Sequence, residues 1–289
     1  ALAYDYEKWG YSNKNSYKEY VAQWSAKTFP TADAALQEKI GTVLTEYINM
    51  NHLRRPEALN AEIYHPCNYG EADKMIARAK ALEALSEDVY ESLTGESKNA
   101  YYSMIHFSAM ASMNLLKMHL YAAKNAFYAK QGKPIANKYG DLVRDCMKKD
   151  GEYYDAFGAF KGGKWNGMQM AQHIGFTKWN DDDYRFPLIV SVEPAHKPRL
   201  KVNRKDAFFT AGKNYGAPMK VVVDDFLYAG NTEVVVEIAN DGVGSIQYVV
   251  EAQTPDKKLP AWLSLNTMGG EVTEQEELVL TCDKSKLTA

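Results

Sequence analysis

Two polar stretches of the sequence carry residue types that contact ligands or perform acid–base chemistry. The first, residues 52–69, contains Arg54-Arg55-Pro56-Glu57 and then Tyr64-His65-Pro66. A carboxylate such as Glu57 can act as a general acid or base at an active site. A loop held together by salt bridges explains the same charges more simply, and we favour that interpretation from the residues alone.

The second stretch, residues 162–179, combines glycines, amides, a histidine and two tryptophans. Glycines interrupt a helical period, so the pattern does not predict a regular core segment here. Trp165, His173 and Trp179 could contact a ligand or a partner domain, because irregular segments often carry binding residues. A buried aromatic plug that closes one end of a helical bundle is an equally good interpretation, and the pattern leaves both open.

Complete catalytic or metal-binding motifs are not recognisable in the sequence. It contains no glycine-rich phosphate loop and no G-x-S-x-G elbow. Cys67, Cys146 and Cys282 lack metal-ligand spacing, and His106 and His119 lie on different faces of one predicted helix. Glycoside hydrolysis usually needs two carboxyl groups flanking the bond, and the spacing identifies no such pair. We therefore expect no catalytic residue, no metal and no cofactor in this chain.

The composition is that of a globular chain without a strong electric field. Its 289 residues carry 34 Lys and Arg against 37 Asp and Glu, for a formal net charge of −3. Nucleic acid and anionic membranes are not expected as partners, because both are bound through a large excess of positive charge. No apolar run approaches the roughly 20 residues that span a bilayer, and residues 1–6 lack the pattern of a signal peptide.

Apolar residues recur at helical spacing from the N-terminus to about residue 185. The segment 98–130 is apolar on nearly every face, which is typical of a helix in the middle of a bundle. Thr31 is a suitable N-cap for the helix that follows it, with Asp33 in the first turn. The helices that we expect lie at 16–29, after Thr31, at 70–93, at 98–130 and at 134–160.

From Arg199 onward, short β-branched runs alternate with turns. Asn240-Asp241-Gly242 and residues 267–270 are predicted turns. The strands that we expect lie at 200–202, 207–210, 219–223, 233–238, 246–251, 262–265 and 277–281. This number of short strands is typical of an immunoglobulin-like sandwich. The sequence therefore predicts an α+β protein with an all-α helical bundle over 1–185, a linker over 186–198 and an immunoglobulin-like β-sandwich over 199–289.

The second polar stretch carries a recognisable signature. Gly163-Lys164-Trp165-Asn166-Gly167-Met168, then Gln172-His173-Ile174-Gly175-Phe176-Thr177 and Trp179, resemble the G-K-W-x-x-M-M-x-Q-x-H-I-G-Y-x-x-W signature of glycoside hydrolase family 115. Phe176 stands where this signature has Tyr. Further blocks resemble the family in the same order: Trp24 to Phe29, Tyr47 to Glu57, Tyr64 to Ala72, Ala111 to Leu115 and Gln131 to Asn137. The resemblance covers about residues 1–190, and the β part is similar to the family's C-terminal sandwich.

This resemblance implies a function in xylan degradation. Members of the family are xylan α-1,2-glucuronidases, which release glucuronic or 4-O-methylglucuronic acid by an inverting route. Their catalytic carboxylates lie in a barrel-like domain that precedes a helical region, and a β-domain comes last. The resemblance thus implies that this chain is a C-terminal accessory region, inactive alone and secreted or periplasmic in the full-length protein.

The resemblance also indicates which residues lie near the substrate. Arg54 or Arg55 could bind a uronic carboxylate through two parallel hydrogen bonds. The implied partners are the preceding barrel-like domain, a xylan-type polysaccharide or oligosaccharide, and a second copy of the chain. The candidate substrate-proximal residues are Arg54, Arg55, Glu57, Tyr64, Asn68, Tyr69, Trp165, His173 and Trp179.

Two alternatives without catalytic activity stay open. Aromatic residues make up 12% of the chain, and because Tyr and Trp combine an apolar face with a polar edge, the β part could be a carbohydrate-binding module. Such modules expose a row of aromatic rings, and the sequence shows no evident row. The methionine-rich helix at 98–130 could instead make the bundle a dimerisation platform.

Overall fold

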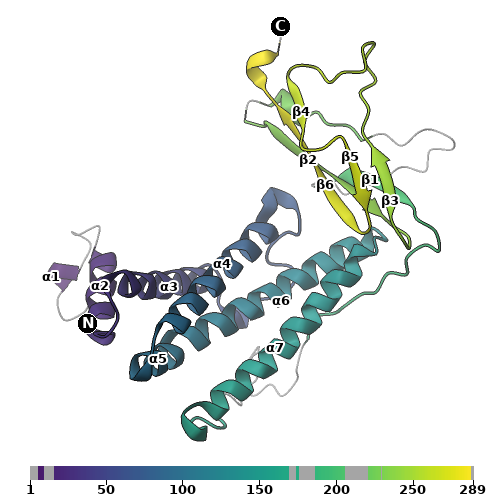
Figure 1. Cartoon of the computed structure of the whole chain (residues 1–289). Coiled ribbons are helices and arrows are strands. Elements are labelled where there is room, and N and C mark those ends of the chain that lie inside the picture. Colours follow the sequence, from purple (N-terminus) through teal and green to yellow (C-terminus); the bar gives the residue numbers. More distant parts are fainter. Residues whose placement is uncertain are drawn as a thin grey trace. The chain divides into compact units, whose positions relative to one another are not determined.

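The structure is a computed structural model that describes residues 6–9, 16–168, 174–175, 186–205, 221–228 and 230–287. Helices occupy the described chain up to Gly163, and antiparallel strands follow from Leu200 (Figure 1). The predicted α+β class is therefore confirmed as a helical region followed by a β-sheet region. Among the described helices, none has both the length and the apolar composition needed to cross a membrane.

The chain folds into two compact units that are discontinuous in sequence. The first comprises Ala1–Tyr64, Ala72–Tyr121 and Leu142–Pro187, and the second comprises His65–Glu71, Ala122–Asp141 and Leu188–Ala289. The second unit thus combines the strands with the end of one long helix and the start of the next. The predicted boundaries, 1–185, 186–198 and 199–289, group residues 122–141 with the bundle, and they remain a prediction about domains that fold independently.

The helices begin and end close to the predicted positions. One prediction, a single helix over 98–130, differs because a π-helical turn divides it. In chain order the helical elements are α1 (Tyr6–Trp9), α2 (Ser16–Thr28), α3 (Ala34–Leu53), α4 (Glu71–Ser92), α5 (Gly95–Tyr101), the π-helical turn η3 (Tyr102–His106), α6 (Phe107–Lys130) and α7 (Ile135–Gly163).

Helix α3 begins later than the sequence predicts. Its N-cap is Asp33, whose Oδ1 accepts a hydrogen bond of 2.8 Å from Leu36 N. The prediction of Thr31 as the cap is wrong, because a turn closed by the Ala32 N–H and Phe29 O occupies that position. The Thr31 hydroxyl pairs instead with the Ser97 hydroxyl at 2.7 Å.

Helix α6 supplies the centre of the first unit as far as Tyr121. Its side chains are buried on successive faces, so the predicted central position of this helix is confirmed. Phe29, Ile40, Val43 and Val89 of the surrounding segments are fully buried. The residues of α6 in this core that are at most 6% exposed include Met113, Leu115, Leu116, Met118, Leu120 and Tyr121.

The π-helical turn η3 ends at His106, whose side chain contacts two residues of α4. His106 is buried, and its Nδ1 lies 2.9 Å from Ser86 Oγ. Its ring stacks on Tyr90 with 4.6 Å between the ring centroids. A π-helical turn accommodates an extra residue in a helix, and here it brings His106 to its partners on α4.

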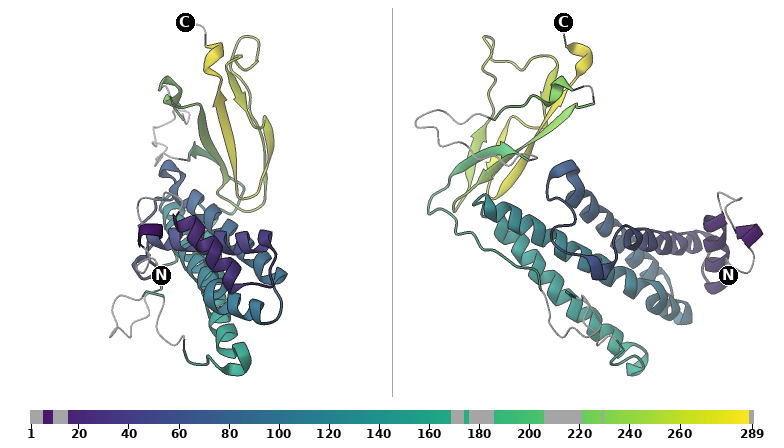
Figure 2. Two further views of the ribbon diagram at one scale, coloured as in Figure 1. Left: turned by 90° about the vertical axis from the view of Figure 1, so that its left-hand side faces the viewer. Right: turned by 180° about the vertical axis from the view of Figure 1, so that it is seen from behind.

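The strands of the second unit form two antiparallel sheets (Figure 2). The first has the order β1-β2-β6-β4, and the second pairs β3 with β5. Both sheets contribute to one buried apolar cluster of Val236, Ile238, Tyr248, Val272 and Leu278. The strands are β1 (Leu200–Arg204), β2 (Glu233–Asn240), β3 (Ile246–Val249), β4 (Leu263–Leu265), β5 (Gly269–Val272) and β6 (Gln275–Cys282).

Strand β2 is buried on both of its faces. Successive side chains of a strand point to opposite faces of the sheet. Val236 and Ile238 join the apolar cluster on one face, whereas Glu237 points to the other face and is only 1% exposed. A charged side chain is thus buried in the middle of strand β2.

One turn prediction and one strand prediction in the β part need correction. The predicted turn at residues 267–270 runs into strand β5, because Gly269 allows a close approach to β3: a Cβ atom there would lie 2.7 Å from Tyr248 O. Residues 221–223 of the predicted strand 219–223 form no strand, and Arg204 Nη1 donates to Val222 O at 3.3 Å in that region. The predicted strand at 207–210 lies outside the described residues.

Candidate functional site

The arginine loop follows directly from helix α3. Arg54 is the C-cap residue, its N–H donates to Met50 O (3.3 Å), and its Nε donates to Ala58 O (3.0 Å). Arg55 precedes the 3-10 turn η1 (Pro56–Ala58). The favoured interpretation of a salt-bridged loop is wrong within the described chain, where Arg54, Arg55 and Glu57 are exposed and form no ion pair. Backbone-directed hydrogen bonds hold the loop instead.

Arg54 and Tyr64 meet around a small cavity of the first unit. Its volume is about 10 Å³, so it holds at most one water molecule and no sugar ring. The walls are mostly apolar and come from α3, α4 and α6. They comprise Met50, Asn51, Arg54, Leu59, Tyr64, Met75, Ser112, Met113 and Leu116. These two predicted site residues therefore line one cavity, which is too small for a sugar.

Asn68 and Tyr69 belong to the second unit, in the 3-10 turn η2 (Asn68–Gly70). Tyr69 has φ 55° and is 86% exposed. This left-handed conformation costs a non-glycine residue roughly 1–2 kcal/mol. His65 Nδ1 fixes the turn by accepting hydrogen bonds from Cys67 N (3.1 Å) and Asn68 N (2.9 Å). A strained backbone and an exposed aromatic ring are features of contact residues, so Tyr69 remains a candidate.

Trp165 lies in the turns that follow α7, which is kinked at Phe160. Its ring is half-buried and lies 6.4 Å from the Phe157 ring, which in turn packs on Phe107 at 4.2 Å. This packing favours the interpretation of Trp165 as part of an aromatic plug. His173 and Trp179, the other candidates of this stretch, lie outside the described residues.

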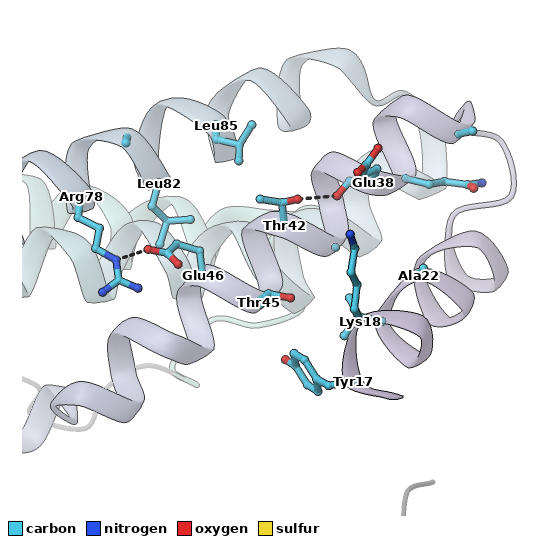
Figure 3. Close-up of a pocket in the computed structure, with 15 residues that line it drawn as sticks. Tyr17, Lys18, Ala22, Glu38, Thr42, Thr45, Glu46, Arg78, Leu82 and Leu85 are labelled. Carbon is cyan, nitrogen blue, oxygen red and sulfur yellow. Dashed lines mark hydrogen bonds and ion pairs between the residues drawn. The ribbon is translucent and has the colours of Figure 1, made fainter. Parts of the chain in front are cut away.

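A groove of about 700 Å³ lies on helices α2, α3 and α4 of the first unit. We call it the α2–α4 groove. Figure 3 shows Tyr17 and Lys18 at one end and the ion pair of Arg78 with Glu46 at the other. Its lining is Tyr17, Lys18, Val21, Ala22, Ala34, Gln37, Glu38, Gly41, Thr42, Thr45, Glu46, Arg78, Ala81, Leu82 and Leu85.

The α2–α4 groove suits an apolar segment of a partner. Aliphatic and small residues such as Val21, Gly41 and Leu82 line it, together with charged residues of both signs. Tyr17 is its one aromatic ring, whereas sugar sites usually offer larger aromatic platforms. Sequence reasoning missed this groove, although alanines and a glycine at helical spacing in α3 and α4 are the signal that could have indicated it.

A buried ionic network anchors the helices of the second unit to its sheet. Lys133 and Glu237 are at most 1% exposed, and Lys133 Nζ lies 2.6 Å from Glu237 Oε2. Tyr128 Oη donates to Glu237 Oε1 at 2.7 Å, and Asn203 Nδ2 donates to Glu237 Oε2 at 3.2 Å. Burial lowers the pKa of Lys133, an effect that Glu237 opposes, and burial raises the pKa of Tyr128. The sequence signal for this network is Glu237 itself, a charge between the apolar residues Val236 and Ile238.

Two asparagines hold the extended segment that leads into the sheet. Asn125 Nδ2 donates to Val190 O and its Oδ1 accepts from Val190 N, both at 2.8 Å. Asn137 makes the same pair of bonds with Val192, at 2.8 and 2.9 Å. Each side-chain amide thus replaces a neighbouring strand for one residue of the segment, which lies in the same compact unit.

Several residues of the sequence blocks therefore have structural roles. Lys133 and Asn137 of the block 131–137 anchor the sheet and the extended segment. Asn114 of the block 111–115 donates to Cys146 O at 2.9 Å and ties α6 to α7. Among the described residues, no group of three or more His, Cys, Asp or Glu side chains could hold a metal ion.

A comparison of the sequence with models of protein families finds no match, and neither does a comparison with curated protein sequences. The family resemblance therefore rests on the sequence blocks alone.

Proposed function

We propose that this chain is the C-terminal accessory region of a glycoside hydrolase that acts on glucuronoxylan. The ordered blocks that resemble glycoside hydrolase family 115 support this role. The main supporting observation is the structural role of three residues in those blocks. Asn114, Lys133 and Asn137 bind other elements of the chain through buried or half-buried hydrogen bonds. Residues of this kind maintain a scaffold, as expected for a region that supports a reaction centre located elsewhere.

In this proposal the catalytic carboxylates lie in a barrel-like domain upstream of Ala1. The whole enzyme releases α-1,2-linked glucuronic or 4-O-methylglucuronic acid with inversion, and it is secreted or periplasmic. Arg55 and Glu57 on the exposed loop and Tyr69 on its strained turn are the residues we assign to contact with substrate or barrel. The proposal also includes an immunoglobulin-like sandwich, which the apolar cluster shared by the two sheets supports.

The α2–α4 groove is the surface that we assign to a segment of the preceding domain. Its size and the aliphatic part of its lining support this assignment, and Ile48 on α3, which is 43% exposed, adds a further apolar side chain to that helix. An apolar segment buried here would gain about 25 cal/mol per Å² of apolar surface removed from water.

The test uses the intact gene product and two matched variants. We expect its reading frame to encode a barrel-like domain before Ala1. Ala81→Trp places an indole in the groove and should lower uronic acid release severalfold, because the ring blocks the docked segment. Ala77→Trp is the control, since Ala77 is exposed on the same helix but does not line the groove. A gene product that begins at Ala1, or equal activity of the two variants, would contradict the proposal.

A further inference from the structure

A second pocket of the first unit, between α4, α6 and α7, combines charges of both signs. We call it the carboxylate–lysine pocket. Its volume is about 350 Å³, at the lower end of the range for small-ligand sites, ~300–1,000 Å³. The lining residues are Glu83, Ala84, Glu87, Met110, Asn114, Lys117, Lys149 and Tyr153.

One ion pair of this pocket is ordered before any ligand binds. Lys117 Nζ lies 2.6 Å from Glu83 Oε2, and these side chains are only 16% and 14% exposed. Glu87 is less constrained: its side chain is 54% exposed, and its Oε2 lies 3.6 Å from Nε2 of His106, beyond hydrogen-bond distance. Groups ordered in advance lose little conformational entropy when a ligand binds.

The balance of charges selects the class of ligand. Glu83 and Glu87 offset Lys117 and Lys149, so a charged ligand would meet repulsion as well as attraction. Burial, together with Glu83 and Glu87, raises the pKa of Tyr153, and its hydroxyl therefore stays protonated. A neutral ligand with several hydroxyl groups can donate to the carboxylates and accept from the ammonium groups and the phenol.

Apolar surface is also present for the carbon skeleton of such a ligand. The thioether of Met110 and the ring of Tyr153 line the pocket, and Lys149 Nζ lies 5.2 Å from the centre of that ring. Tyr and Met side chains contact the C–H faces of polyhydroxylated rings without requiring a charge.

We propose that the carboxylate–lysine pocket binds one pyranose unit of a neutral saccharide, through Glu87 and Tyr153 in particular. This binding site goes beyond the proposed accessory role, because it needs neither an upstream domain nor a reaction centre. It would hold a neutral sugar chain on the helical part of the protein.

Isothermal titration calorimetry of the 289-residue chain tests this proposal, with xylohexaose and cellohexaose as neutral probes and glucuronic acid as a charged one. We expect millimolar binding of at least one neutral probe and weaker binding of the acid. Glu87→Ala and Tyr153→Phe should each weaken binding about tenfold, because each removes one hydrogen bond to the sugar. Lys148→Ala is the control, since Lys148 is 80% exposed and lies outside the pocket lining.

Thermal unfolding of each variant shows whether the fold is kept. Loss of binding in both pocket variants, with unchanged binding in the control, supports the site. No binding of any neutral probe would overturn the proposal, as would binding that survives both substitutions or a preference for the acid. The accessory role is tested separately, by the intact gene product and the groove variants Ala81→Trp and Ala77→Trp.

Discussion

At the scale of single residues, the buried pair of Lys133 and Glu237 has the largest energetic consequences. Both side chains are excluded from water at a separation of 2.6 Å. Removing an ion from water costs several kcal/mol, which the partner charge and the added hydrogen bonds from Tyr128 and Asn203 offset. The pair therefore contributes little net stability as a whole, but either charge alone is strongly unfavourable.

Lys133→Met tests this dependence, because it leaves the Glu237 carboxylate buried without its cation. We expect a loss of about 3–5 kcal/mol in the free energy of unfolding, measured by urea denaturation. Lys138→Met is the matched control: Lys138 pairs with Glu274 at 2.8 Å, but the two side chains are 57% and 51% exposed, so the loss should stay below ~1 kcal/mol. Equal losses in the two variants would refute the role of burial.

His119 gives a pH-dependent prediction. Burial lowers its pKa to about 4, and its Nδ1 finds no hydrogen-bond partner among the described residues. The unfolded chain takes up a proton near pH 6.5, whereas the folded chain does so only near pH 4. Folding is therefore favoured above pH 6.5, and that stability is lost as the pH falls towards 4.

As the pH falls from 7 to 5, protonation of His119 in the unfolded chain should lower the free energy of unfolding by about 2 kcal/mol. His119→Met removes this proton uptake, so the variant should lose about that much less stability over the same pH range. The measurement is urea unfolding at both pH values, with the exposed His52→Gln as the control. An unchanged pH dependence in His119→Met would contradict the account.

At the scale of elements, the asparagine pairs determine the path of the segment that leads into β1. Asn125 and Asn137 bind alternate residues, Val190 and Val192, whose N–H groups have no strand partner. Such bonds matter because an unsatisfied buried amide costs about 1–3 kcal/mol.

Hydrogen exchange of the two valine amides tests these pairs one at a time. Asn137→Ala should speed exchange at Val192 and leave Val190 nearly unchanged, and Asn125→Ala should do the reverse. Each variant is thus the control for the other. Equal acceleration at both amides in either variant would show that the segment is held as a whole by other contacts.

The sequence predicted elements better than it predicted the contacts between them. Helical spacing and β-branched runs indicated most helices and strands, because those signals are local. Gly269 was misread as a turn residue, since the close approach of Tyr248 O that requires a glycine depends on strand pairing. The Lys133–Glu237 pair joins residues far apart in the sequence, and no local pattern identifies such partners.

The candidate site was predicted less well for the same reason. Arg54 and Tyr64 line a cavity too small for a sugar, and Trp165 packs on Phe157. The α2–α4 groove was missed because its lining comes from three helices, each of which reads as an ordinary amphipathic segment. Tyr69 is the predicted residue with the clearest features of a contact site, given its exposure and its left-handed backbone.

At the scale of the whole molecule, we propose that this chain has a structural role and that the catalytic residues lie elsewhere. Asn114, Lys133 and Asn137 of the family-like blocks are engaged in internal anchoring, and the α2–α4 groove has a partly aliphatic lining that suits an apolar partner segment. The acid and base of the reaction would then reside in a domain that this chain positions.

The most direct measurement is the release of uronic acid from glucuronoxylan, compared between the purified 289-residue chain and the intact gene product under identical conditions. The account predicts release by the intact product and none above background by the chain alone, at equal molar concentration. Robust release by the chain alone would contradict it, because a complete reaction centre would then lie within these residues.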